Sequence, residues 1–151
     1  MKTLRGDLLA YALNGRLNVI IHGCNCFCNF GAGIAKQIRN TFPEAFDADK
    51  KTKVGNKDKL GTISYAEVIR GSKGITIVNA YTQFAFGGGR VNADYDAIDS
   101  CFQQIRDQFA GRNLAIGYPL IGCGLAGGDW SIVRPIIDEN LKGLDHYLII
   151  K

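Results

Sequence analysis

The sequence contains no uninterrupted apolar run close to the roughly 20 residues that a membrane-spanning helix requires. No secretory cleavage signal follows the short apolar stretch near the N-terminus, which acidic and polar residues interrupt. Internal repeats, low-complexity tracts and linkers are also missing. The 151 residues suffice for one hydrophobic core but not for two ordinary domains. We therefore expect a single domain over residues 1–151, without a membrane partner.

Two common phosphate-binding fingerprints are absent as well. Neither GxxxxGK[ST] nor GxGxxG occurs, which disfavours a P-loop and a dinucleotide-binding Rossmann domain. The formal net charge is +4, but the basic residues are scattered and only KKTK at 50–53 forms a cluster. This charge favours a small anionic ligand over sequence-specific DNA binding.

Five cysteines are present, and three of them alternate as Cys24, Cys26 and Cys28. Disulfides within such a close set would be strained, so a reducing cytoplasm is the expected compartment. No second cysteine cluster or histidine pair completes a metal site, and we expect neither a metal nor another cofactor. If the segment continued as a strand, the three side chains would point the same way. We interpret them as buried or loop thiols, with Cys28 a candidate for oxidation.

Apolar runs alternate with amphipathic ones along the chain. The runs predict strands at 17–25, 60–69, 74–82, 114–122 and 146–151, and helices at 31–42, 92–111 and 129–143. Residues 43–59 are expected to be a helix end followed by a solvated loop. This order predicts a three-layer α/β/α sandwich around a mixed, mostly parallel sheet. Ligands of such sheets bind outside the carboxyl ends of the strands.

The segment PLIGCGLAGGDW at 119–130 places four glycines between a predicted strand and a predicted helix. Glycines allow main-chain amides to approach a phosphate at a helix N-terminus, although a tight turn has the same composition. Two further glycine clusters, at 30–33 and 87–89, also follow predicted strands. Taken together, the three clusters favour a nucleotide-like ligand.

Three segments carry a resemblance to a known family: GDLL at 6–9, VIIHGCNCFCNFGAGIAKQI at 19–38 and PLIGCGLAGGDW at 119–130. They resemble the macrodomain, a module that binds ADP-ribose, and in particular its ADP-ribose-1″-phosphate phosphatase branch, as found in bacteriophages and yeast. The resemblance covers nearly the whole chain in the same order. It implies the three-layer sandwich, the partners ADP-ribose and ADP-ribose-1″-phosphate, and hydrolysis of ADP-ribose-1″-phosphate to ADP-ribose and phosphate.

The resemblance also implies roles for individual residues. Asp7 would accept a hydrogen bond from adenine, and Asn25 would lie near the distal ribose; a helix cap and an Asx turn are the respective alternatives. Phe86 would flank the ribose or adenine, unless it serves only packing. The full set of implied ligand-binding residues is Asp7, Leu8, Asn25, Gly31, Ala32, Gly33, Ile34, Asn79, Phe86, Gly122, Cys123, Gly124, Leu125, Ala126 and Gly127.

His22 and Asp129 are the catalytic candidates. The position of His22 matches a histidine of the phosphatase branch, whereas a single strand histidine is often a core residue. Asp129 suits general acid–base chemistry, and it also suits the N-cap of the following helix.

Other functions stay open at this point. A non-enzymatic reader of ADP-ribose and an ADP-ribosyl hydrolase are the alternatives within the family. The lysine-dependent hydrolase is disfavoured because the 79–84 region, NAYTQF, lacks a lysine and Ala126 occupies the position of an expected aspartate. The positive charge leaves RNA or poly-ADP-ribose as a further partner to consider.

Overall fold

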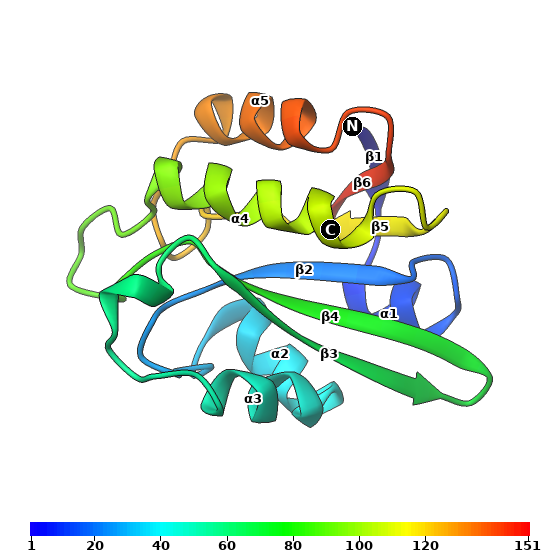
Figure 1. Cartoon of the computed structure of the whole chain (residues 1–151), viewed down its shortest axis with the longest axis horizontal. Coiled ribbons are helices and arrows are strands. Elements are labelled where there is room, and N and C mark those ends of the chain that lie inside the picture. Colours follow the sequence, from blue (N-terminus) through cyan, green and yellow to red (C-terminus); the bar gives the residue numbers. More distant parts are fainter.

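The computed structural model describes all residues from Met1 to Lys151. Its centre is one six-stranded sheet in the order β1-β6-β5-β2-β4-β3, in which every neighbouring pair is parallel except β3 and β4 (Figure 1). In chain order the elements are β1 (Lys2–Arg5), α1 (Leu8–Leu13), β2 (Val19–Cys24), α2 (Gly33–Thr41), α3 (Pro43–Lys50), η1 (Lys57–Lys59), β3 (Ile63–Arg70), β4 (Lys73–Tyr81), α4 (Tyr95–Phe109), β5 (Ala115–Tyr118), α5 (Trp130–Asn140) and β6 (Asp145–Ile150).

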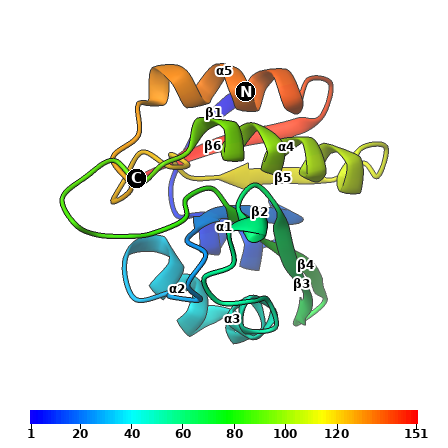
Figure 2. The ribbon, with the colours of Figure 1, turned by 60° about the vertical axis from the view of Figure 1, so that its left-hand side comes forward.

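Helices cover both faces of this sheet. Helices α1, α2 and α3 lie on one face, and α4 and α5 lie on the other (Figures 1 and 2). Each face has its own core of 16 buried apolar residues. The three-layer sandwich with a mixed, mostly parallel sheet is therefore confirmed.

The central strand and the longest helix follow directly from their sequences. Five of the six residues of β2 are buried, as a strand between two parallel neighbours requires. In α4, Ile98, Phe102, Ile105 and Phe109 form a buried stripe that recurs at helical spacing. Asp94 caps this helix by accepting a hydrogen bond from the amide of Ala97.

Local structure differs from the sequence-based expectation at three places. Residues 43–59 contain a separate helix, α3, because Pro43 occupies its first turn, where a missing amide hydrogen costs nothing. The strand expected at 114–122 ends at Tyr118, before Pro119. Strand β1 and the short helix α1 precede the first predicted strand, and their four and six residues are too short for a clear periodic pattern.

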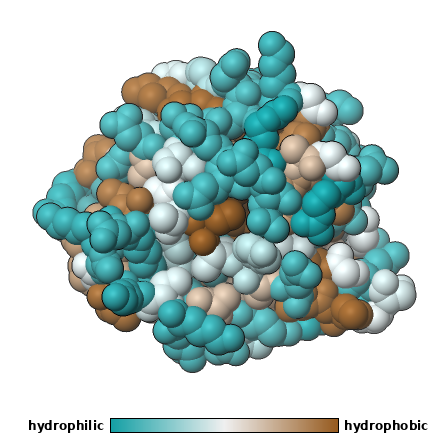
Figure 3. Space-filling model, in the orientation of Figure 1, coloured by the Kyte–Doolittle hydropathy of each residue, from teal (hydrophilic) through white to brown (hydrophobic).

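The molecular surface carries no large continuous apolar face in the view of Figure 3, where apolar residues form separate patches among hydrophilic ones. No helix has the length and apolar character needed to cross a membrane.

Candidate functional site

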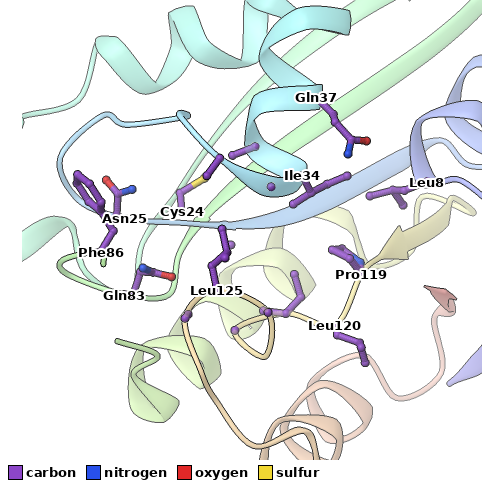
Figure 4. Close-up of a pocket in the computed structure, with 18 of the residues that line it drawn as sticks. Leu8, Cys24, Asn25, Ile34, Gln37, Gln83, Phe86, Pro119, Leu120 and Leu125 are labelled. Carbon is purple, nitrogen blue, oxygen red and sulfur yellow. The ribbon is translucent and has the colours of Figure 1, made fainter. Parts of the chain in front are cut away.

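A cavity of about 770 Å³ opens at the carboxyl ends of the parallel strands. Its wall is built from segments that follow β1, β2, β4, β5 and β6, together with the first turns of α1 and α2 (Figure 4). Because parallel strands all end at the same edge of a sheet, segments distant in sequence meet there. This volume is in the range of a pocket for a small organic ligand.

The loop at 119–128 leaves several main-chain amides unpaired in the cavity wall. Within the loop, the amides of Cys123, Gly127 and Gly128 donate to carbonyl oxygens of the loop itself. The amides of five wall residues of this loop donate no hydrogen bond; these residues are Leu120, Gly122, Gly124, Leu125 and Ala126. Unpaired amides that converge on a cavity favour an anionic ligand.

Helix α2 adds its N-terminus to the same wall. Its N-cap residue is Ala32, which supplies no side-chain oxygen to the first turn. The amides of Gly33, Ile34 and Ala35 therefore stay without an intrahelical or capping partner, and all three residues line the cavity. The partial positive charge of this helix end also favours an anion.

Few wall residues carry an ionisable side chain. They are Asp7, Cys24 and Lys151. Burial raises the pKa of the Cys24 thiol well above its ordinary value, with the nearby Asp49 charge adding to the effect. An anion in this cavity would therefore be held mainly by backbone amides and the helix dipole.

Most of the sequence-predicted ligand residues line the cavity. They are Asp7, Leu8, Asn25, Ala32, Gly33, Ile34, Phe86, Gly122, Gly124, Leu125 and Ala126. Asn25 and Phe86 lie together at one end of the cavity in Figure 4, and Leu8 lies toward the other, with Leu125 between them.

Asp7 and Asn25 also fill the local roles that their sequence context offered as alternatives. Asp7 caps α1, since its Oδ1 accepts from the amide of Ala10 at 3.0 Å, and its Oδ2 lies 3.8 Å from Lys151 Nζ. Asn25 forms an Asx turn, with its Oδ1 accepting from the amide of Phe27 at 2.9 Å. Neither role removes the residue from the cavity wall.

Four predicted ligand residues do not line the cavity. The amides of Gly31, Cys123 and Gly127 are occupied by local hydrogen bonds. Asn79 is completely buried, and its amide nitrogen donates to the Ala45 carbonyl oxygen and to Ser64 Oγ.

His22 lies behind the wall. It is completely buried, and its ring packs edge-on against Phe30 with centroids 5.0 Å apart. Because the Asn79 amide nitrogen donates elsewhere, Asn79 Oδ1 accepts from His22 Nε2 at 2.7 Å, which leaves the proton on Nε2. Burial lowers the pKa of His22 to about 4, and the hydrogen bond with Asn79 raises it by a smaller amount. The imidazole is therefore neutral near pH 7.

Asp129 lies outside the cavity wall, on the surface. Its Oδ1 accepts from the amide and the hydroxyl of Ser131 at 2.9 and 2.7 Å, which makes it the N-cap of α5. These hydrogen bonds lower the pKa of the Asp129 carboxyl. The structure does not bring His22 and Asp129 into contact.

The three alternating cysteines do not share one direction, contrary to the expectation for a continuing strand. The strand ends at Cys24, and the loop that follows turns each thiol to a different partner. The Cys24 thiol lies 3.5 Å from His22 Nε2, the Cys26 thiol donates to the Gln83 carbonyl oxygen, and the Cys28 thiol donates to the Asp49 carbonyl oxygen. No group of three or more His, Cys, Asp or Glu side chains is arranged to hold a metal ion.

Sequence reasoning missed several wall residues. Gln37 follows Gly33 by one helical turn, so the amphipathic pattern of α2 carried a weak signal for it. Gln83 directly follows the predicted strand 74–82, and its place at the carboxyl end of that strand was a weak signal for the cavity. Ile149, Ile150 and Lys151 reach the cavity only because β6 lies beside β1 and β5, which no local pattern reveals. The remaining missed residues are Gly6, Gly23, Cys24, Asn29, Ala35, Gly87, Pro119, Leu120 and Ile121.

Comparison with protein families gives a match to the Macro domain over residues 21–137. The chain belongs to the macrodomain family. This macrodomain is 36% identical, over 154 aligned positions, to a 17.5 kDa protein of the tk-vs intergenic region of Enterobacteria phage T4; the alignment covers 99% of this chain and 95% of the phage protein.

Solved structures show the same fold. The macrodomain of Mycobacterium tuberculosis DarG superposes with a TM-score of 0.78 at 21% identity, covering 99% of this chain and 97% of that one. Thermosipho africanus DarTG, solved in complex with ADP-ribose, superposes with a TM-score of 0.72 at 18% identity, covering 93% of this macrodomain and 39% of the DarTG chain.

Proposed function

We propose that the cavity binds ADP-ribose. The observation that carries this proposal is the set of unpaired amides at Gly122, Gly124, Leu125 and Ala126, which faces the uncapped N-terminus of α2 across one cavity. A diphosphate placed between them would receive hydrogen bonds from two segments and the favourable end of the helix dipole. Membership of the macrodomain family and the ADP-ribose bound to Thermosipho africanus DarTG support the same ligand.

The ends of the cavity suit the two halves of this ligand. Asp7 and Leu8 would receive the adenine, with one Asp7 oxygen capping α1 and the other available beside Lys151. Asn25 and Phe86 would flank the distal ribose at the opposite end (Figure 4). Aromatic and amide side chains are suited to sugar faces and hydroxyl groups.

Gly124 provides the sharpest test of binding. No atom lies within 4 Å of the position a Cβ would take at Gly124, and the residue lines the cavity, so Gly124→Val fills ligand space rather than protein space. We expect roughly tenfold weaker ADP-ribose binding by calorimetry, about 1.4 kcal/mol, because the added methyl groups displace the diphosphate. Gly74→Val is the matched control, since Gly74 also has open space around it but lies in β4 away from the cavity. Equal affinity of the two variants would contradict the proposal.

We further propose that the protein hydrolyses ADP-ribose-1″-phosphate to ADP-ribose and phosphate in the same cavity. His22 and Asp129 are the acid–base candidates. Both candidates are near wall residues in the sequence, which supports this function. Gly23 and Cys24 of the wall follow His22 directly, and Ala126 of the wall precedes Asp129 by three residues. Because His22 lies behind the wall, direct contact with substrate requires movement of the Gly23–Cys24 segment. If that segment does not move, His22 acts as a positioning residue that holds the cavity wall in place through its contact with the Cys24 thiol.

Measuring phosphate release in variants of the two residues distinguishes a catalytic role from a positioning role. Asp129→Asn keeps an oxygen for the α5 cap but removes the carboxylate, so a catalytic Asp129 predicts lost turnover with unchanged ADP-ribose affinity. His22→Ala would lower kcat and alter its pH profile if the imidazole transfers a proton. A positioning role would raise KM instead.

The outcomes distinguish the functions. ADP-ribose binding without phosphate release would leave the reader function and reject the phosphatase. If the protein bound RNA but not ADP-ribose, both the reader function and the phosphatase function would be rejected.

A further inference from the structure

A buried charged cluster lies outside the cavity, between α3, η1 and the loop that follows β2. Lys59 Nζ lies 3.6 Å from Asp49 Oδ1 and donates to the Cys26 carbonyl oxygen at 3.4 Å. The same ammonium nitrogen lies 3.4 Å from Cys28 Sγ. The Cys28 thiol in turn donates to the Asp49 carbonyl oxygen at 3.3 Å. A nucleophilic sulfur and a lysine nitrogen are thus held in contact.

Both side chains of the ion pair next to this contact are buried. The side chains of Lys59 and Asp49 are 5% and 0% exposed. Asp49 Oδ1 also accepts from the Tyr81 hydroxyl at 2.7 Å, whereas Asp49 Oδ2 is buried without any hydrogen-bond partner. A buried carboxylate with an unused oxygen is costly unless an opposite charge lies beside it, and the Lys59 ammonium supplies that charge. The cluster therefore holds a sulfur atom and an amine nitrogen in contact, beside a buried carboxylate.

The position of Cys28 differs from that of the other cysteines. Cys24, Cys26 and Cys101 are buried, and burial raises the pKa of each of these thiols. Cys123 is partly exposed, and burial raises the pKa of its thiol as well. Cys28 is partly exposed in the loop, so an oxidant can reach it, and its sulfur touches Lys59 rather than another thiol.

We propose that Cys28 and Lys59 form a reversible covalent crosslink, a sulfenamide, when the protein meets hydrogen peroxide. In the first step the thiol is oxidised by two electrons to the sulfenic acid, and peroxide is reduced to water. The Lys59 ammonium then releases one proton to solvent. The neutral amine attacks the Cys28 sulfur, an S–N bond forms, the S–O bond breaks, and the hydroxyl leaves as water with the second amine proton.

The crosslink would connect the loop after β2 to η1. Asn25 and Asn29 in this loop line the cavity, so the link would fix one part of the wall to a separate element. Two equivalents of an external thiol reverse it, restoring the thiol and amine and forming one disulfide. The proposal is independent of the ligand that the cavity binds, because it rests on the three contacts around Lys59.

Peptide mapping tests the crosslink on the whole chain. The purified, reduced protein is treated with a small excess of hydrogen peroxide, its remaining thiols are alkylated, and it is digested with trypsin. We expect a linked pair of peptides, residues 17–36 and 58–70, lighter by about 2 Da than the sum of the two and separated by dithiothreitol. Lys59 within the second peptide should escape cleavage, because its amine is blocked. Thermal unfolding should occur several degrees higher in the linked form, since a closed loop restricts the unfolded chain.

Matched variants identify the two partners. Cys28→Ser and Lys59→Arg should each abolish the linked peptides, and Lys59→Arg should increase trapping of the Cys28 sulfenic acid by dimedone. Lys57→Arg changes the neighbouring exposed lysine of η1 and should leave the crosslink intact. Circular dichroism verifies that each variant is folded. Oxidation of Cys28 to a sulfinic acid or to a disulfide in the wild-type protein, with Lys59 unlinked, would overturn the proposal.

Discussion

The His22 imidazole is held in its neutral form by the packing around it. Alternate residues of a strand face opposite sides, and His22 shares its side with Ile20 and Cys24, which pack toward α2 and α3. Asn79 accepts from its Nε2 while donating to the Ala45 carbonyl oxygen of α3. The histidine is thus part of a buried hydrogen-bonded pair that joins β2, β4 and α3.

This burial predicts a loss of stability in acid. In the unfolded chain a histidine titrates near 6.5, whereas the folded pKa of His22 is about 4. Between these values the unfolded state binds one more proton, so the free energy of unfolding falls as the pH is lowered, by a total of roughly 3 kcal/mol from this residue. His22→Gln, which stays neutral, should flatten the decline between pH 6.5 and 4 in urea unfolding curves.

His146→Gln is the companion variant for this measurement. The pKa of His146 is also lowered, by burial and by the N-terminal charge. This variant should therefore remove the His146 contribution to the pH dependence of the free energy of unfolding and leave the His22 contribution unchanged. A His22→Gln protein with the wild-type slope would show that the buried imidazole does not set the acid response.

At the scale of elements, aspartates begin three of the helices. Asp7, Asp94 and Asp129 each accept a main-chain hydrogen bond in the first turn of α1, α4 and α5. Helix α2 is different, because Ala32 at its N-cap provides no such oxygen. Helix α3 also lacks a side-chain cap, but of these two helices only α2 begins at the cavity, where a bound anion can take the place of a cap.

The cap of α4 predicts a measurable stability effect. Asp94→Ala removes the oxygen that accepts from the Ala97 amide, and we expect unfolding to become easier by about 1 kcal/mol. Asp107→Ala is a control on the same helix, since Asp107 is exposed near the C-terminal end, where a negative charge is unfavourable. Chemical denaturation should leave the control unchanged or slightly more stable. Similar losses in both variants would argue against the cap.

At the scale of the whole molecule, the cavity depends on strand pairing between the ends of the chain. Strand β1 pairs in parallel with β6, so that Lys2 lies opposite Tyr147 and Arg5 opposite Ile150. This pairing brings Asp7 beside Lys151 and closes one end of the cavity. A ligand that fills the cavity therefore contacts segments from both ends of the sequence.

Binding should consequently stabilise the entire domain. At an ADP-ribose concentration of about 100 times Kd, mass action adds roughly 2.7 kcal/mol to the free energy of unfolding, which raises Tm by roughly 5–10 °C for a domain of this size. Differential scanning calorimetry with AMP as a comparison measures this effect, and AMP should produce a smaller shift because it lacks the second phosphate and ribose. An unchanged Tm at saturating ADP-ribose would contradict a site built from both chain ends.

Sequence patterns alone determined the layers, the buried central strand, the long helix α4 and the glycine-rich turns near the cavity. They succeeded because burial along β2, the apolar stripe of α4 and the positive φ of Gly122 are local properties that residue type controls. The caps at Asp7 and Asp129 were readable for the same reason.

The resemblance anticipated most of the cavity wall, but only the tertiary structure decided which other groups reach it and which candidates stay outside it. Strand order brings Ile149 and Lys151 to the wall, and it buries His22 against Phe30 while Asp129 stays on the surface. It also places Cys28 against Lys59, 31 residues further along the chain. These arrangements depend on contacts between segments far apart in sequence, and local patterns carry no information about such distances.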